Sequence, residues 1–273
     1  MIQIRFHGRG GHGIKTASRI LGTAAFLQGY EAQDSPLYGA ERRGAPIVAF
    51  TRIAEMPILM RGMITEPDIV IIADETLITD GPGSPLDGID SKTLVFVNTP
   101  ATPKSLLEQI TIPGRLVTMD VTGLVTDTFG SPRALSGAVG SVACRLSDII
   151  NEPHMIEAVT EELTALGLHD DDIVKNLTIA EACFTEMLPA VQSTMRRSER
   201  SAGGNRAVTL HSHPATISAP NIYAHGNTLL RHTGAWRFSR PTIDLSRCTK
   251  CGICVMRCPD GALALDEEGY PVI

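Results

Sequence analysis

Four cysteines near the end of the chain constrain its fold and chemistry more than any other feature. Cys248, Cys251, Cys254 and Cys258 follow the spacing CxxCxxCxxxC, and Pro259 comes directly after the last of them. This is the bacterial pattern for a 4Fe–4S cluster, because two-residue gaps let one short loop present three thiolates to three iron corners. CxxC pairs also hold zinc, but zinc sites usually separate two such pairs by a longer loop. We therefore predict an iron–sulfur module that carries electrons.

The fourth cysteine raises a further question. In two-cluster ferredoxins the fourth cysteine of each run ligates the other cluster, and this sequence holds one run. We expect Cys258 to begin a short helix after the turn at Pro259, followed by a β-hairpin that turns at 266–269. The second run of a two-cluster ferredoxin begins just beyond such a hairpin. We therefore expect two clusters in the intact module, with a second run beyond Ile273. A ligand from another subunit and a degraded single-cluster module are the alternatives.

Composition excludes several classes of function. The chain has 273 residues, 43% of them hydrophobic, which is enough for one large and one small domain. A net charge of -6 argues against nucleic-acid partners and acidic membrane surfaces, both of which need a basic protein face. No apolar run approaches the length of a membrane span, and the start lacks the pattern of a signal peptide. We expect a cytoplasmic protein without a membrane partner. Cys144 and Cys183, outside the run, are expected to be buried.

Apolar runs alternate with helical patterns through the first two-thirds of the chain. This predicts an α/β fold with a mainly parallel sheet and helices on both faces, plus a small ferredoxin-like iron–sulfur module. The expected strands are residues 2–7, 46–53, 68–74, 93–98 and 115–121. The expected helices are residues 14–28, stopped by Gly29, then 134–150, 153–167 and 173–195, the last of them beginning after the three aspartates at 170–172. The composition then shifts to Ser, Gly, Pro, Asn, His and Arg. The predicted organisation is a domain at 1–197, an extended linker at 198–240 and the cysteine module at 241–273.

A glycine-rich turn, GRGGHG, lies between the first strand and the first helix. Gly8, Gly10 and Gly13 match GxGxxG in the context that lets a backbone approach a phosphate at a helix N-terminus. A tight turn with close helix–sheet packing explains the same glycines at least as well. A nicotinamide site also needs a buried second strand that ends in an acid. Asp34 stands at the right distance, but no buried strand precedes it.

Two arginines in the loop SPLYGAERRGAP extend this candidate region. Guanidinium groups suit phosphates and carboxylates, although an exposed pair also suits a subunit interface, which we favour here. The candidate cofactor-binding residues are Gly8, Arg9, Gly10, Gly11, His12, Gly13, Arg42 and Arg43.

Three segments together resemble the 2-oxoacid:ferredoxin oxidoreductases. IRFHGRGGHG and SPLYGAERRGAP with the strand IVAFTRI resemble the gamma subunit of that family. GAWRFSRPTIDLSRCTKCGICVMRCPDGAL resembles the ferredoxin-like delta subunit, so the chain resembles a gamma–delta fusion over 1–190 and 230–273. Two features depart from the family: His12 stands where Gln is usual, and the delta module usually carries two cysteine runs.

The resemblance implies oxidative decarboxylation of a 2-oxoacid on thiamine diphosphate, with electrons passing through 4Fe–4S clusters to ferredoxin. It implies alpha and beta partner subunits that hold thiamine diphosphate, Mg and the catalytic acid, so no catalytic residue is expected in this chain. Coenzyme A is the acyl acceptor in most members, and the glycine-rich turn or Arg42 and Arg43 would lie near its phosphates. Pyruvate or another 2-oxoacid is the expected substrate, with oxalate a further candidate because of His12. The alternatives are a nicotinamide-dependent iron–sulfur oxidoreductase and an independent ferredoxin-like carrier.

Overall fold

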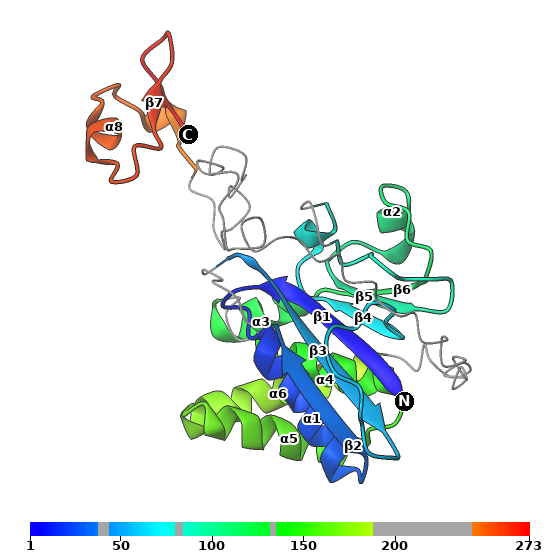
Figure 1. Cartoon of the computed structure of the whole chain (residues 1–273). Helices are drawn as coiled ribbons and strands as arrows, with labels where there is room; N and C mark the ends of the chain where they lie inside the picture. Colours follow the sequence, from blue (N-terminus) through cyan, green and yellow to red (C-terminus); the bar gives the residue numbers. More distant parts are fainter. Residues whose placement is uncertain (38–43, 80–83, 132–134, 188–241) are drawn as a thin grey trace, which may run out of the picture. The chain divides into compact units, whose positions relative to one another are not determined.

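The computed structural model of the chain describes residues 1–37, 44–79, 84–131, 135–187 and 242–273. These residues fall into two compact units, one within Met1–Trp236 and one within Arg237–Ile273 (Figure 1). The linker predicted at 198–240 lies outside the described residues, so its boundaries and those of the flanking domains stay a prediction. Arg42 and Arg43 also lie outside them.

A six-stranded sheet organises the larger unit. Its strands are β1 (Ile2–Arg9), β2 (Glu31–Pro36), β3 (Pro46–Ala54), β4 (Ile69–Ile72), β5 (Leu94–Asn98) and β6 (Arg115–Met119). In space they follow the order β2-β3-β1-β4-β5-β6. Strands β1, β4, β5 and β6 run parallel, whereas β3 pairs antiparallel with both β1 and β2. The sheet is mainly parallel, as predicted, with an antiparallel hairpin added beside β1.

Strand β2 is an element that the sequence pattern does not reveal. Its residues are exposed or half-buried, as suits an edge strand that pairs on one side only. It contains Asp34, which pairs with Thr51 of β3. In a nicotinamide-binding fold the strand that ends in this acid lies parallel beside β1. Here the antiparallel β3 occupies that position, which argues against a nicotinamide site built on Asp34.

The helices divide unequally between the two faces of the sheet. The long helices α1 (Ile14–Leu27), α4 (Leu135–Ser147), α5 (Glu152–Ala165) and α6 (Asp170–Glu186) pack together on one side (Figure 1). Helix α3 (Val121–Phe129) contributes to the same core. The other face is covered by the short η1 (Glu75–Ile78) and α2 (Pro103–Leu107).

Alternating side chains of the central strands belong to two hydrophobic cores, one on each face of the sheet. Ile69 and Ile71 of β4 belong to the core of the long helices, whereas Val70 and Ile72 belong to the smaller core on the opposite face. Successive side chains of a strand point to opposite faces, so a strand covered on both sides is apolar at every position. This is why IVII and its neighbour LVFV are continuous apolar runs.

Strand β1 departs from this rule on one face. Gln3, Arg5, His7 and Arg9 alternate with the buried Ile4 and Phe6, and three of these four polar side chains are buried as well. Arg5 Nη1 donates to the carbonyl oxygen of Ile64 at 3.2 Å, and its Nη2 donates to that of Pro85 at 2.9 Å. Hydrogen bonds of the buried Arg5 therefore stabilise this face of β1, whereas apolar packing stabilises the neighbouring strands.

His7 lies in the same polar layer and is 5% exposed. Burial, with a smaller contribution from the positive charge of Arg5, lowers the pKa of His7 to about 3. Its Nε2 has no hydrogen-bond partner among the described residues. The imidazole is therefore neutral over the physiological range, and protonating it would place a second charge beside Arg5.

The smaller unit consists of short elements around the cysteine run. They are η3 (Leu245–Arg247), α8 (Ile253–Arg257), β7 (Ala264–Leu265) and β8 (Pro271–Val272). Strands β7 and β8 pair antiparallel, and the amide of Asp266 donates to the carbonyl oxygen of Tyr270 at 2.9 Å, so the predicted hairpin is confirmed. Among the described residues of this unit only Pro271 is buried.

The helix predicted to start at Cys258 is wrong. Helix α8 precedes this cysteine, which has the extended angles φ -71° and ψ 113°. The turn at Pro259 and Asp260 is followed by Gly261 with φ +59°, a left-handed conformation that interrupts a helix. The described helices contain no segment long and apolar enough to cross a membrane.

Substitution of Gly8 by Ala is expected to destabilise the larger unit. A Cβ at Gly8 would lie 2.2 Å from Cγ1 of Ile14, a fully buried side chain without room to move. We expect the free energy of unfolding to fall by about 1–3 kcal/mol, as in other overpacked cores. Gly22→Ala is the matched control, because its Cβ would meet its nearest atom, Cβ of Asp34, at 3.8 Å. Gly22→Ala should raise the free energy of unfolding by about 0.5–1 kcal/mol, because alanine favours the helical conformation over glycine. Urea unfolding of the full chain measures the free energy of unfolding of both variants. Equal changes in Gly8→Ala and Gly22→Ala would contradict the proposed steric clash with Ile14.

The burial of His7 predicts a specific loss of stability in acid. Between pH about 6.5 and about 3 the unfolded chain binds a proton at His7 that the folded chain does not bind. The free energy of unfolding should therefore fall as the pH falls through this window, by up to about 1.4 kcal/mol per pH unit from this group. His7→Gln should flatten the profile measured by urea unfolding. His169→Gln, at an exposed position, should retain the wild-type profile, and parallel profiles for wild type and His7→Gln would refute the assignment.

Candidate functional site

The parallel strands end at one edge of the larger sheet, and polar side chains gather there. After β1 the chain enters α1 on one face, and after β4 it enters η1 on the other face. The topological switch point therefore lies between β1 and β4. Ligands of open α/β sheets bind at such a point, outside the carboxyl ends of the strands. The glycine-rich turn at 8–13 and the segment 73–76 form the two sides of this point.

Arg9 occupies the switch point and is 1% exposed. Its Nε donates to Oδ2 of Asp74 at 2.9 Å, and its Nη2 donates to Oγ1 of Thr76 at 2.6 Å. Its Nη1 donates to the carbonyl oxygen of Gly44 at 3.2 Å. The guanidinium therefore holds together the end of β1, the segment after β4 and the segment before β3. A ligand contact of Arg9 stays a prediction, since these bonds direct the side chain toward its own chain.

The glycines of the turn fit the packing of the chain itself. Gly8 faces Ile14, and Gly13 has φ +72° and would place a Cβ 2.7 Å from Cβ of Ser136. The amide of Gly10 donates to the carbonyl oxygen of Ala45 at 2.8 Å. These contacts support a tight turn and close helix packing, whereas a phosphate contact of residues 8–13 stays a prediction.

One property of the turn is compatible with an anion. Gly13 caps α1 without a side-chain hydrogen bond, and the first turn of this helix contains no acidic residue. The positive end of the helix dipole is therefore not offset by an acid in that turn. His12 beside it is 8% exposed, and burial lowers its pKa, with Asp74 acting in the opposite direction and Arg9 in the same direction.

Asp74 and Thr76 are partners of Arg9 that the sequence patterns did not predict. Asp74 also accepts the amide of Thr76 at 3.0 Å and so caps η1. Asp74 lies two residues after the end of the apolar strand β4, and Arg9 continues the polar alternation of β1. These two signals point to the carboxyl edge of the sheet, but the pairing of distant segments does not follow from them.

The cysteine run directs backbone amides toward its own sulfurs. The amide of Lys250 donates to Sγ of Cys248 at 3.4 Å, and that of Ala262 donates to Sγ of Cys258 at 3.3 Å. The backbone amide of Ile253, followed by smaller contributions from Thr249 and other groups, lowers the pKa of Cys251.

Amides directed at cysteine sulfurs are typical of iron–sulfur sites, so the donor set of four cysteines fits 4Fe–4S ligation. The described residues place no three His, Cys, Asp or Glu side chains close enough to hold a metal ion. The fit therefore rests on the donor set and on the direction of the amides.

Two further cysteines lie in the larger unit and are buried, as predicted. Burial raises the pKa of Cys144, and burial with a smaller contribution from Glu186 raises that of Cys183. Both side chains stay thiols at neutral pH and are unsuited to metal binding.

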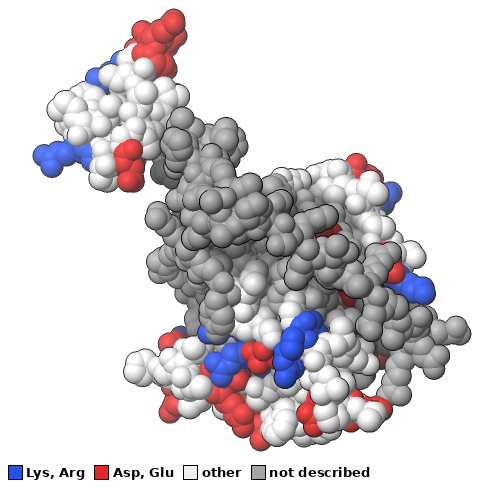
Figure 2. All heavy atoms as spheres, viewed as in Figure 1, with Lys and Arg blue, Asp and Glu red and all other residues white. Residues whose placement is uncertain are grey.

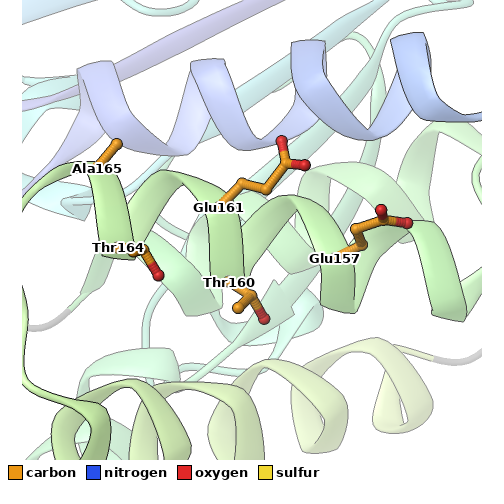
Figure 3. A pocket seen from close by; sticks show the side chains of 5 residues that line it. All are labelled: Glu157, Thr160, Glu161, Thr164 and Ala165. Carbon is orange, nitrogen blue, oxygen red and sulfur yellow. The ribbon is translucent and has the colours of Figure 1, made fainter.

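A hollow of about 590 Å³ lies along helix α5 (Figure 3). It is lined by Glu157, Thr160, Glu161, Thr164 and Ala165. All five residues come from this one helix, and Figure 3 shows the side chains of Glu161 and Thr160 pointing in different directions. None of them belongs to the carboxyl edge of the sheet or to the cysteine run, so the hollow is not part of the candidate site.

Comparisons with known proteins agree with both units. The family model described as pyruvate ferredoxin/flavodoxin oxidoreductase matches residues 3–186, and that described as 4Fe-4S binding domain matches residues 241–264. The common gamma subunit of the pyruvate/ketoisovalerate oxidoreductases of Thermococcus kodakarensis is 38% identical over 188 residues, covering 68% of this chain and 97% of the relative. Pyruvate synthase subunit PorC of Methanocaldococcus jannaschii is 36% identical over 189 residues, covering 69% of this chain and 98% of the relative.

A solved structure supports the fold of the larger unit. The crystal structure of the pyruvate oxidoreductase subunit PORC from Thermotoga maritima matches with a TM-score of 0.55 and 26% identity, covering 67% of this chain and 95% of that chain. The family model spans more than half of the sequence, and the cysteine run lies within the second match. The chain belongs to the pyruvate ferredoxin/flavodoxin oxidoreductase family and joins a gamma-type domain to a 4Fe–4S binding domain.

Proposed function

We propose that this chain is the electron-relay subunit of a thiamine diphosphate-dependent 2-oxoacid:ferredoxin oxidoreductase. It takes single electrons from the oxidative decarboxylation of a 2-oxoacid and passes them to ferredoxin. The observation that carries the proposal is the presence of both parts on one chain. The oxidoreductase-family domain covers residues 3–186, and the cysteine run that follows directs amides toward its sulfurs.

The cysteine run supplies the electron relay. Cys248, Cys251 and Cys254 would ligate one 4Fe–4S cluster, and Cys258 would ligate the second cluster of the intact module. Such clusters supply one-electron transfer at a low potential when bound. The amides of Lys250 and Ala262 stabilise negative charge on Cys248 and Cys258. An electron that arrives adds negative charge, so hydrogen bonds to the sulfurs favour its uptake.

The catalytic chemistry is assigned to alpha and beta partner subunits, which hold thiamine diphosphate and Mg. The relatives are named as subunits, which supports partner chains. Within the described residues, the charged side chains at the switch point bond to one another, as Arg9 does to Asp74. This arrangement stabilises a domain rather than offering an acid or base to a substrate. We place the complex in the cytoplasm.

Pyruvate is the first substrate to consider, because the relatives are named for pyruvate. Other 2-oxoacids and oxalate are further candidates, and coenzyme A is the candidate acyl acceptor. Its phosphates are proposed to approach the N-terminus of α1, where the first turn contains no acidic residue.

An exposed apolar loop provides a surface for the partner subunits. We call residues 55–63 the methionine loop; its apolar side chains Met56, Leu59, Met60 and Met63 are 74%, 87%, 50% and 63% exposed. Arg52, which is 1% exposed, donates to the carbonyl oxygen of Gly62 at 2.8 Å and anchors the end of the loop. Methionine is flexible and adapts to different partner surfaces. The relative from Thermococcus kodakarensis is a gamma subunit common to two oxidoreductases, a role that suits such a surface.

Loss of one cluster ligand should abolish the electron relay. We expect the full chain to co-purify with its native alpha and beta subunits, and the complex to reduce ferredoxin with a 2-oxoacid. Cys254→Ser should remove the 4Fe–4S signal of this chain from EPR spectra and abolish ferredoxin reduction, because the cluster lacks a thiolate. The substrate is identified by comparing pyruvate, 2-oxoglutarate, branched-chain oxoacids and oxalate, with and without coenzyme A.

Cys144→Ala is the matched control, since this buried thiol lies in the larger unit. It should leave the cluster signal and ferredoxin reduction unchanged. A Cys254→Ser complex that reduces ferredoxin at the wild-type rate would contradict the relay.

Charges on the methionine loop should weaken subunit association. Met56→Glu combined with Met60→Glu is expected to raise the dissociation constant for the partner subunits about tenfold or more, because the burial of apolar surface is lost. The stability of the isolated chain should not change, as both side chains are exposed. Val174→Glu, at a 61% exposed position on α6, is the control. Sedimentation of mixed subunits measures the effect, and equal affinities for the loop variant and wild type would exclude the loop from the interface.

A further inference from the structure

Lys250 has a backbone conformation that is unusual for a residue with a side chain. It stands between Cys248 and Cys251 with φ +58°. Non-glycine residues populate this left-handed region sparsely and stay there only when their surroundings hold them. With this backbone conformation, the amide of Lys250 donates to Sγ of Cys248 at 3.4 Å. An unfavourable conformation is thus combined with a hydrogen bond to a cluster ligand.

The side chain of Lys250 supplies the interactions that hold this conformation. Its Nζ donates to the carbonyl oxygen of Glu268 at 2.8 Å and lies 3.9 Å from the centre of the Tyr270 ring. A Cβ on Gly269 would lie 3.8 Å from Cδ of Lys250, so the stem of the lysine passes close to the hairpin turn. One side chain therefore joins the cysteine run to the hairpin through a hydrogen bond, a cation–π contact and packing.

The charge of the hairpin favours the same contact. Asp266, Glu267 and Glu268 are exposed in its turn, and Figure 2 shows acidic side chains gathered at that tip of the smaller unit. An ammonium group placed at this turn is attracted to it. Pro271 is the only buried residue among the described residues of this unit, so the cysteine run is not held in place by an apolar core. Polar contacts such as those of Lys250 therefore hold much of the cysteine run in position.

We propose that Lys250 is a positioning residue for the cluster ligand Cys248. Its side chain, anchored on Glu268 and Tyr270, holds the left-handed backbone that keeps its amide directed at the thiolate. The inference rests on the proposed 4Fe–4S cluster of this module. Hydrogen bonds to ligand sulfurs set the reduction potential of such clusters, and a donor to the thiolate stabilises the more negative, reduced form. Lys250 therefore raises the potential of the cluster and retains its iron.

Four variants of the full chain distinguish a positioning role of Lys250 from an effect of its positive charge alone. Lys250→Ala removes both anchors, and Tyr270→Leu removes the ring but leaves the lysine charge. Lys250→Arg retains a cation that stacks on the ring and donates to the carbonyl. Arg257→Ala removes an exposed positive charge at the end of α8, beside Cys258. EPR-monitored redox titration measures the potential, and transfer of iron to a chelator measures retention.

We expect Lys250→Ala and Tyr270→Leu to shift the potential to more negative values and to release iron about two- to fivefold faster, as the loss of an exposed cation–π contact predicts. Lys250→Arg should behave as wild type, and Arg257→Ala should release iron at the wild-type rate. Complete loss of iron from Lys250→Ala, with full iron in Lys250→Arg, also supports the proposal.

Two results would overturn the role of Lys250 while leaving the proposed function intact. One is a wild-type potential and iron-release rate in Lys250→Ala. The other is an equal potential shift in Lys250→Ala and Arg257→Ala with none in Tyr270→Leu, which would show an effect of charge alone. A wild-type chain without a 4Fe–4S signal would overturn both the inference and the proposed relay.

Discussion

A buried guanidinium at the carboxyl end of β1 is the interaction on which the larger unit depends. Arg9 is 1% exposed, and its ion pair with Asp74 is joined by bonds to Thr76 and Gly44. Removing one partner of a buried ion pair leaves an uncompensated charge, which is strongly destabilising. The ends of β1 and β4 and the start of β3 must therefore keep their relative positions whenever the domain is folded. The switch point, where α/β proteins place their ligands, is in this way a rigid part of the scaffold.

The two units are stabilised by different physical means. The larger unit buries apolar side chains on both faces of its sheet, in two separate cores. The smaller unit has one buried residue, Pro271, among those described, and relies on amide–sulfur bonds and on the link from Lys250 to the hairpin. Metal ligation contributes folding free energy in small units that lack a core. The cluster thus has a structural as well as an electronic role in the proposed function.

Local patterns predicted much of the fold and of the cysteine site. The continuous apolar runs at β4 and β5 and the turn at Asp266 were sufficient to place strands and a hairpin. Strand β2 was missed because an edge strand carries no buried face. The helix predicted at Cys258 was wrong because the chain turns at residues 259–260 and then takes a left-handed conformation at Gly261, which interrupts a helix.

The sequence by itself indicated the family, the iron–sulfur character of the cysteine run and the positions of most strands. Ligand spacing and side-chain periodicity are properties of neighbouring residues, so they can be recognised without a fold. Only the tertiary structure decided the antiparallel position of β3 beside β1, the burial of Arg9 against Asp74 and the anchoring of Lys250 on Tyr270. Each of these depends on contacts between residues far apart in the chain, and neither residue of such a pair identifies its partner through its own neighbours.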